Sequence, residues 1–159
     1  TIDYALTALE HLGAFARALG VKLLVENLTN DVTTPATLVT LLELGHLDNV
    51  GVCLDLGHAH MTVGIPEAVS VLGQRIVSLH VHDNHGAKDE HLWPGDGSID
   101  WKETAKRLSA LANPPAAVLE IGYALGDAAG VVPERVGASF DKLNEQPVVQ
   151  FDIGKTLRG

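Results

Sequence analysis

Short apolar runs alternate with amphipathic segments along most of this chain. Four runs stand out because they are rich in aliphatic residues and hold few polar ones, a pattern typical of parallel strands buried on both faces. These runs are Val21–Val25, Val50–Leu54, Ile76–Leu79 and Ala116–Leu119. They predict four β-strands.

The segments between the runs carry helical spacing and helix-end signals. The stretch Ile2–Leu19 has apolar residues near helical spacing and predicts an amphipathic helix. Thr34 followed by Pro35 predicts a helix start, and that helix runs to about Leu44 and stops at Gly45. Further helices are predicted at Pro66–Leu72, from Asp100 and at Pro133–Leu143, while residues 146–159 stay ambiguous. Alternating strands and helices predict an α/β fold with a parallel sheet.

Composition is consistent with one domain built around an aliphatic core. The chain has 159 residues, of which 46% are apolar and only 4% aromatic. No apolar run has the length of a membrane span, so we expect no membrane partner. The lone cysteine, Cys53, excludes an intramolecular disulfide and is expected to be an inert buried thiol. With no targeting motif visible, a cytoplasmic location is the expectation.

The formal net charge of −9 counts against nucleic acid as a partner. The 11 lysines and arginines are scattered and form no basic run. Bound metal ions would supply positive charge that this count omits. Charge alone therefore makes a nucleic-acid role unlikely without excluding it.

Each of the four predicted strands ends in a side chain that can bind a metal. These residues are Glu26, Asp55, His80 and Glu120. The carboxyl ends of parallel strands share one edge of a sheet, where α/β barrels and open α/β sheets place their active sites. A single carboxylate after a strand often only caps a helix, but four potential ligands at four successive strand ends are hard to assign to capping. This donor set predicts a site for one divalent ion, namely Mn²⁺, Mg²⁺, Co²⁺ or Zn²⁺.

More polar groups follow the same strand ends. His58 comes three residues after Asp55 and is a candidate for substrate contact or a second metal. His82 shares strand parity with His80, so both are expected to face inward. Asp89 and His91 lie in a long polar loop, ahead of a glycine-rich stretch at residues 94–97. That stretch either lets the backbone approach a ligand closely or is an ordinary surface turn.

These motifs resemble those of the xylose isomerase-like TIM-barrel superfamily, which includes sugar phosphate isomerases, epimerases and endonuclease IV. The segments that carry the resemblance are LVEN (24–27), CLDLGH (53–58), LHVHDN (79–84), DEHLWPGDG (89–97) and VLEI (118–121). The resemblance implies a partial (β/α)8 barrel and covers roughly residues 21–122. It is far more specific for fold and metal site than for substrate.

Carried over by position, Glu26, Asp55, His80 and Glu120 match the metal ligands shared across the family. In its isomerases and epimerases two glutamates also move the substrate proton, and Glu26 and Glu120 match that pair. The resemblance therefore implies metal-dependent isomerisation or epimerisation of a sugar or sugar phosphate, in which the metal stabilises an enediolate. His58, Asp89 and His91 match an additional zinc site in the nuclease, and similar loops occur in the sugar enzymes.

The departure from the family lies in size. A TIM barrel has eight strands and typically about 250 residues, whereas this sequence predicts four strands that match the second half of the barrel. We expect residues 1–159 to be a single domain truncated at its N-terminus, completed by a missing half barrel or by a second copy of the chain. Two alternatives to the isomerase stay open: a zinc phosphodiesterase acting on abasic DNA, and an inactive metal-binding or assembly fragment.

Overall fold

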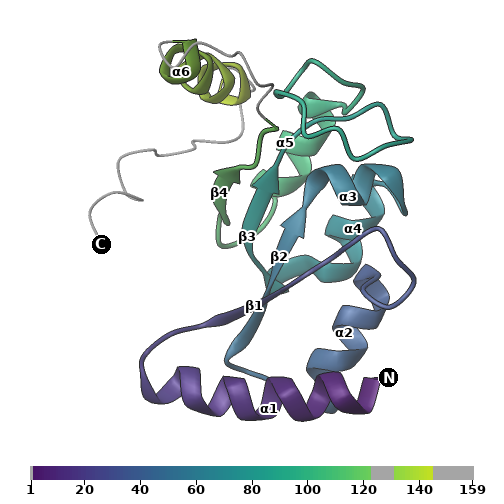
Figure 1. Ribbon diagram of the computed structural model, residues 1–159, viewed down its shortest axis with the longest axis vertical. Coiled ribbons are helices and arrows are strands. Elements are labelled where there is room, and N and C mark those ends of the chain that lie inside the picture. Colours follow the sequence, from purple (N-terminus) through teal and green to yellow (C-terminus); the bar gives the residue numbers. More distant parts are fainter. Residues whose placement is uncertain (1, 123–130, 145–159) are drawn as a thin grey trace.

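The computed structural model describes residues 2–122 and 131–144 as strands, helices and the loops between them (Figure 1). In chain order the elements are α1 (Ile2–Ala18), β1 (Leu23–Glu26), α2 (Pro35–Leu44), β2 (Val50–Asp55), α3 (Leu56–Met61), α4 (Ile65–Leu72), the 3-10 turn η1 (Gly73–Arg75), β3 (Ile76–Val81), α5 (Trp101–Ser109), β4 (Ala116–Leu119) and α6 (Val131–Asn144). The four strands form one parallel sheet in the order β1-β2-β3-β4. This confirms the predicted α/β class, while the ambiguous tail at 146–159 lies outside the described residues.

Helix ends follow the predicted signals. The Thr34 hydroxyl accepts a hydrogen bond from the backbone N–H of Thr37 at 3.2 Å, and Pro35 occupies the first turn of α2. Asp100 caps α5 by accepting from the N–H of Glu103 at 2.9 Å. Both predicted helix starts are confirmed.

Two elements differ from the sequence prediction. β3 continues to Val81, so His80 lies within the strand rather than just past it. The short helix α3 was not predicted, because its sequence has histidines and glycine in place of an apolar helical stripe. Its N-cap is Asp55, whose carboxylate accepts from the His58 N–H at 2.7 Å. The side chain that ends β2 therefore also starts the next helix.

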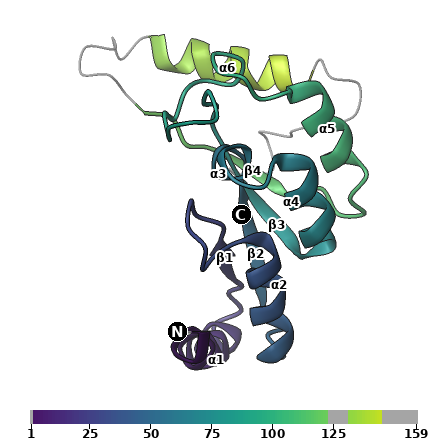
Figure 2. The ribbon, with the colours of Figure 1, turned by 90° about the vertical axis from the view of Figure 1, so that its right-hand side faces the viewer.

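The core lies between the sheet and the helices that cover one of its faces. Helices α2, α4 and α5 stand along this face, and Figures 1 and 2 show them on the same side of the strands. The strand residues that point toward them are excluded from solvent. Val52, Leu54, Leu79 and Val81 each have 0% exposure. Aliphatic packing on this face fixes which side chains must point the opposite way.

The opposite face of the sheet carries the predicted ligands. Leu24 and Val118, on the outer strands β1 and β4, are 39% and 48% exposed, whereas their neighbours along each strand pack on the core. Because side chains alternate along a strand, Glu26 lies on the side of Leu24, and Glu120 lies on the side of Val118. The predicted ligands therefore lie on the sheet face turned away from α2, α4 and α5.

Helix α1 is confirmed, but its apolar side is mostly open. Phe15 and Leu19 are among the apolar residues whose helical spacing predicted this helix, and they are 68% and 65% exposed. Instead α1 buries its small residues Gly13 and Ala16, and it contacts α2 and β1 beneath the sheet (Figure 1). None of the helices in the described part of the chain combines the length and apolar character needed to cross a bilayer.

Candidate metal centre

The four strand-end residues come together around one nitrogen atom. Nδ1 of His80 lies 3.3 Å from Oε1 of Glu26 and 3.0 Å from Oε2 of Glu120. It also lies 3.9 Å from Oδ2 of Asp55, which is paired with His80 in the β2–β3 register. One potential ligand atom from each of the four residues lies within 4.8 Å of the other three. We call this group the strand-end cluster.

The strand-end cluster has the dimensions and chemistry of a divalent metal site. Nitrogen and oxygen ligands stand about 2.0–2.2 Å from zinc or a similar ion, so two ligand atoms of one ion are at most about 4.4 Å apart. Atoms within 4.8 Å of one another need only small side-chain movements to meet this limit. Three carboxylates this close repel one another unless a cation lies among them. The residues present therefore fit a divalent ion.

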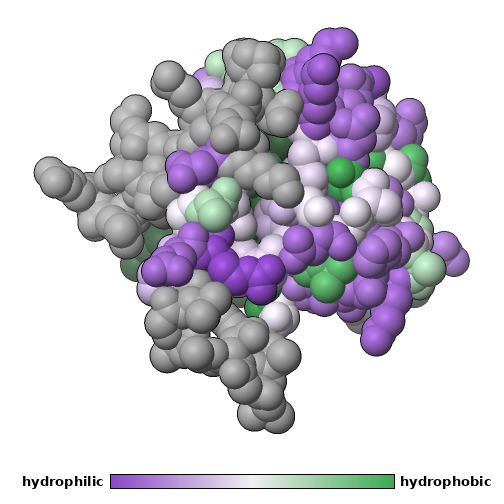
Figure 3. All heavy atoms as spheres, turned by 90° about the horizontal axis from the view of Figure 1, so that it is seen from above, coloured by the Kyte–Doolittle hydropathy of each residue, from purple (hydrophilic) through white to green (hydrophobic). Residues whose placement is uncertain are grey.

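The side chains of the strand-end cluster differ in how far they are exposed to solvent. Asp55 is fully buried, whereas the Glu120 side chain is 46% exposed. Figure 3 views the molecule from above, toward the end of the sheet where the arrows of Figure 1 point, and hydrophilic residues predominate on the described part of that face. Within the cluster, Glu120 is therefore the side chain most open to solvent and Asp55 the least.

Asp55 is held in place by Asn27, which the sequence analysis did not single out. The Asn27 amide donates to the backbone carbonyl of Asp55 at 3.0 Å, and its side-chain oxygen accepts from the Asp55 N–H at 2.8 Å. Asn27 is itself buried and directly follows Glu26. This pair of hydrogen bonds ties the end of β1 to the end of β2. The signal for it in the sequence was an amide side chain immediately after a strand-end ligand.

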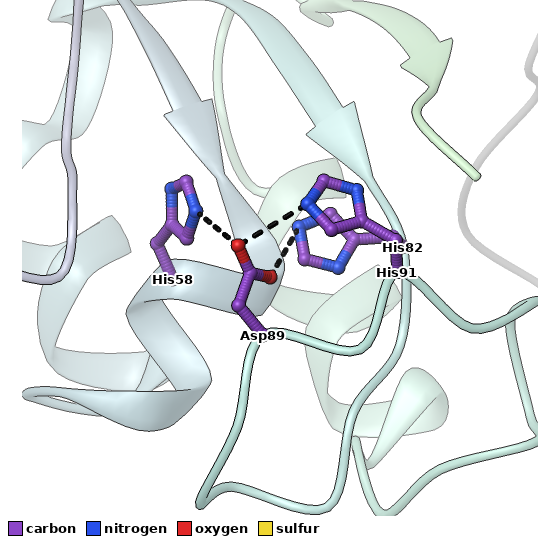
Figure 4. A group of neighbouring side chains, drawn as sticks. All are labelled: His58, His82, Asp89 and His91. Carbon is purple, nitrogen blue, oxygen red and sulfur yellow. Dashed lines mark hydrogen bonds and ion pairs between the residues drawn. The ribbon is translucent and has the colours of Figure 1, made fainter. Parts of the chain in front are cut away.

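A second group of side chains, drawn in Figure 4, lies beside the first, because Nδ1 of His58 is 3.6 Å from both Glu26 and Asp55. Nε2 of His58 and Nε2 of His91 each lie 3.2 Å from Oδ2 of Asp89. The structure thus brings together the three residues that the sequence proposed for substrate contact or a second metal. We call them the loop cluster.

Backbone carbonyls orient both imidazoles of the loop cluster. Nδ1 of His58 donates to the carbonyl of Asn27 at 2.9 Å, and Nδ1 of His91 donates to the carbonyl of Glu120 at 2.8 Å. Since a carbonyl only accepts, each Nδ1 carries the hydrogen and each Nε2 faces the Asp89 carboxylate. This second-shell arrangement is typical of histidines that bind a metal through the other nitrogen.

Nε2 of His58 and of His91 faces the Asp89 carboxylate. With no cation between the nitrogen and the carboxylate, the two attract each other only when the imidazole is protonated. Burial opposes the charged form of His58, but the Asp55 carboxylate, the Asn27 carbonyl and Asp89 outweigh it and raise its pKa. The pKa of His91 is also raised, because the Glu120 carbonyl and Asp89 outweigh burial. In both cases the neighbouring carboxylate favours a positively charged partner at the imidazole.

The loop that carries Asp89 and His91 is anchored by Asp83. This fully buried carboxylate accepts hydrogen bonds from the N–H groups of Gly95 at 2.8 Å and Ile99 at 3.1 Å, and from the indole of Trp101 at 2.8 Å. A Cβ on Gly97 would lie 2.3 Å from Oδ1 of Asp83. The glycine-rich stretch therefore lets the backbone approach the buried side chain of Asp83. The sequence had suggested either a close approach to a ligand or an ordinary surface turn.

His82 and Cys53 complete the buried surroundings. His82 has 0% exposure and, like His80, reaches Asp55, as strand parity predicted. Cys53 is buried, as predicted, and this burial raises the pKa of its thiol to about 11, which disfavours the reactive thiolate.

A family model described as xylose isomerase-like TIM barrel matches residues 1–138. The chain is 32% identical over 130 residues to the uncharacterized protein MJ1311 of Methanocaldococcus jannaschii, covering 77% of this chain and 41% of that protein. Among solved structures it resembles a D-tagatose 3-epimerase-like protein, with 28% identity, a TM-score of 0.70 and coverage of 91% of this chain and 56% of the other. It also resembles a D-psicose 3-epimerase, with 22% identity, a TM-score of 0.67 and coverage of 91% and 52%.

The chain thus spans about half the length of these proteins. Its four parallel strands with their helices form part of a (β/α)8 barrel, as the sequence predicted. The match over residues 1–138 shows that this chain belongs to the xylose isomerase-like TIM-barrel family.

Proposed function

We propose that this chain supplies the metal-binding and proton-transfer residues of a sugar or sugar phosphate isomerase or epimerase. The observation that carries the proposal is the convergence of three carboxylates on Nδ1 of His80 at 3.0 to 3.9 Å. The named structural relatives, a D-tagatose 3-epimerase-like protein and a D-psicose 3-epimerase, support the class of reaction.

Glu26, Asp55, His80 and Glu120 would hold one divalent ion in this proposal. When bound, such an ion polarises a substrate carbonyl as a Lewis acid and offsets the negative charge that develops during proton removal. Asp55 is fully buried and is fixed by Asn27, so it serves the site as a rigid ligand. The three other side chains are partly exposed, so a substrate could reach them.

Glu26 and Glu120 are the proposed proton carriers. They come from the outer strand β1 and from the end of the outer strand β4, and both contact His80 from different sides of the cluster. A carbon held between them can lose its proton to one carboxylate and receive a proton from the other. Return to the same carbon from the opposite side gives epimerisation, and return to the neighbouring carbon gives isomerisation.

Metal titration tests the proposed centre. We expect the chain to bind one Mn²⁺ or Co²⁺ ion in calorimetric titration, and we expect His80→Ala to weaken that binding by at least about 100-fold because it removes the central ligand. His85→Ala is the matched control, because His85 is exposed and pairs with Glu90 in the loop. Equal affinity in wild type and His80→Ala would contradict the proposed centre.

The loop cluster supports a second candidate, a zinc-dependent phosphodiesterase that acts on abasic DNA. The specific observation is that His58 and His91 both direct Nε2 toward Asp89 while carbonyls hold their other nitrogens. The titration separates the candidates by stoichiometry. One ion per chain favours the isomerase, two or three zinc ions favour the nuclease, and no binding at micromolar concentrations favours an inactive fragment.

We also infer that the open sheet face is covered by further βα units, either another half barrel or a second copy of the chain. Leu24 and Val118 are exposed on this face, and α1 exposes Phe15 and Leu19. Apolar surface of this kind is typical of an interface. The chain also spans about half the length of the barrels it resembles.

Sedimentation of the chain on its own checks this inference. We expect a particle heavier than the 16.8 kDa monomer, because the open sheet face and its two outer strands promote association. Leu24→Asp, at a position 39% exposed, is expected to shift the particle toward monomer without loss of helical signal. A well-folded wild-type monomer would contradict the inference.

A further inference from the structure

His82 lies between the two clusters and has no role in the function proposed above. Its Nε2 is 3.1 Å from Oδ1 and 3.2 Å from Oδ2 of Asp55, a member of the strand-end cluster. Its ring also stacks on His91 of the loop cluster, with centroids 4.0 Å apart and planes inclined by 11°. His82 thus touches both candidate centres while being fully buried.

The stacking geometry argues against His82 as a ligand of the loop cluster. Its Nε2 is 3.8 Å from Oδ1 of Asp89, near enough to be grouped with that cluster. However, an imidazole binds a metal along the nitrogen lone pair, in the plane of the ring. One ion cannot lie in the planes of two rings that are stacked face to face. Since His91 directs Nε2 toward Asp89 at 3.2 Å, His82 must have a different role.

The surroundings of His82 fix its ring against Asp55. A Cβ on Gly57 would lie 2.0 Å from Cε1 of His82, so the main chain of α3 closes directly on the imidazole. Asn84 holds that main chain by donating to the Gly57 carbonyl at 3.0 Å. Nδ1 of His82 has no hydrogen-bond partner among the described residues. The Asp55 carboxylate is therefore the acceptor toward which the ring is oriented.

We propose that His82 is a positioning residue that fixes the Asp55 carboxylate as a metal ligand by donating its Nε2–H to it. Asp55 receives a second donor, because its Oδ1 also accepts from the His58 N–H at 2.7 Å. These two donors prevent the carboxylate from rotating and leave Oδ2 facing His80. The inference rests on the proposed metal centre and assigns it a second-shell residue.

The position of the donor, rather than the size of the side chain, distinguishes this role from packing. A glutamine amide nitrogen can occupy the place of Nε2, whereas an asparagine amide corresponds to Nδ1 and a leucine has no donor. We expect His82→Leu and His82→Asn to raise the Kd for Co²⁺ by about 10- to 100-fold, the usual cost of losing a second-shell partner. His82→Gln should stay within a few-fold of wild type. The exposed His85 offers the control His85→Asn, which should have no effect.

The readouts are calorimetric Kd and the visible absorption of bound Co²⁺, with circular dichroism of each metal-free variant to verify folding. If His82→Asn unfolds, His82→Leu carries the comparison because it keeps an apolar side chain in the buried space. Wild-type affinity in folded His82→Leu, or equal loss in the glutamine and leucine variants, would overturn the positioning role. Absence of Co²⁺ binding by the wild-type chain would instead overturn the proposed metal centre.

Discussion

Replacing Glu120 by glutamine is expected to lower ketose turnover by about 10²- to 10⁴-fold, the range for loss of a general acid or base. The amide keeps an oxygen that can face the metal centre, 3.0 Å from His80 in the native side chain, but it cannot accept a proton. Turnover is measured on a panel of ketohexoses with metal at saturating concentration. Deuterium uptake from solvent at the reacting carbon provides a direct measure of proton transfer.

Glu43→Gln is the matched control for this experiment. Glu43 lies on α2 and forms an exposed ion pair with Arg75, so its loss should leave turnover unchanged. Metal content is determined for both variants, which separates a lost proton carrier from a lost ligand. Turnover of Glu120→Gln within a few-fold of wild type, with full metal content, would refute the assignment of Glu120.

Asp83→Ala is expected to cost at least about 3 kcal/mol of folding free energy, because it leaves several buried donors without an acceptor. The N–H groups of Gly95 and Ile99 and the indole of Trp101 all donate to this carboxylate. Loss of these bonds releases the loop that carries the loop cluster. Urea denaturation measures the change in the free energy of unfolding.

Asp96→Ala provides a comparison in the same loop. Asp96 is exposed and pairs with Arg135 at 3.0 Å, so its removal should change stability by no more than about 0.5 kcal/mol. Similar stabilities for the two variants would show that Asp83 does not anchor the loop.

The strands and their end residues were predictable because each depends on local sequence. Aliphatic runs specify buried parallel strands, and a parallel sheet brings the ends of its strands to one edge. This reasoning placed Glu26 and Glu120 together although they lie far apart in the chain. The α/β class and the grouping of four candidate ligands follow from these local patterns, whereas the barrel was implied by the resemblance to the family.

The supporting contacts were not predictable in the same way. Asn27 and His82 act through bonds to Asp55, and these bonds depend on the relative depth of neighbouring strands. The exposed side of α1 was also missed, because helical spacing shows that Phe15 shares a side with other apolar residues but not what covers that side. Local patterns therefore define elements and ligands, whereas tertiary contacts define how rigidly those ligands are held.

The two outer strands of the sheet, β1 and β4, have a consequence for assembly. Because β1 and β4 are opposite edges of the sheet, pairing β4 of one molecule with β1 of another is a head-to-tail, or heterologous, contact. Such contacts close into a ring when the rotation per subunit divides a full turn, and otherwise they continue as a filament. Four strands of an eight-stranded barrel correspond to half a turn. The curvature of this small sheet would then decide between a closed pair and an open fibre.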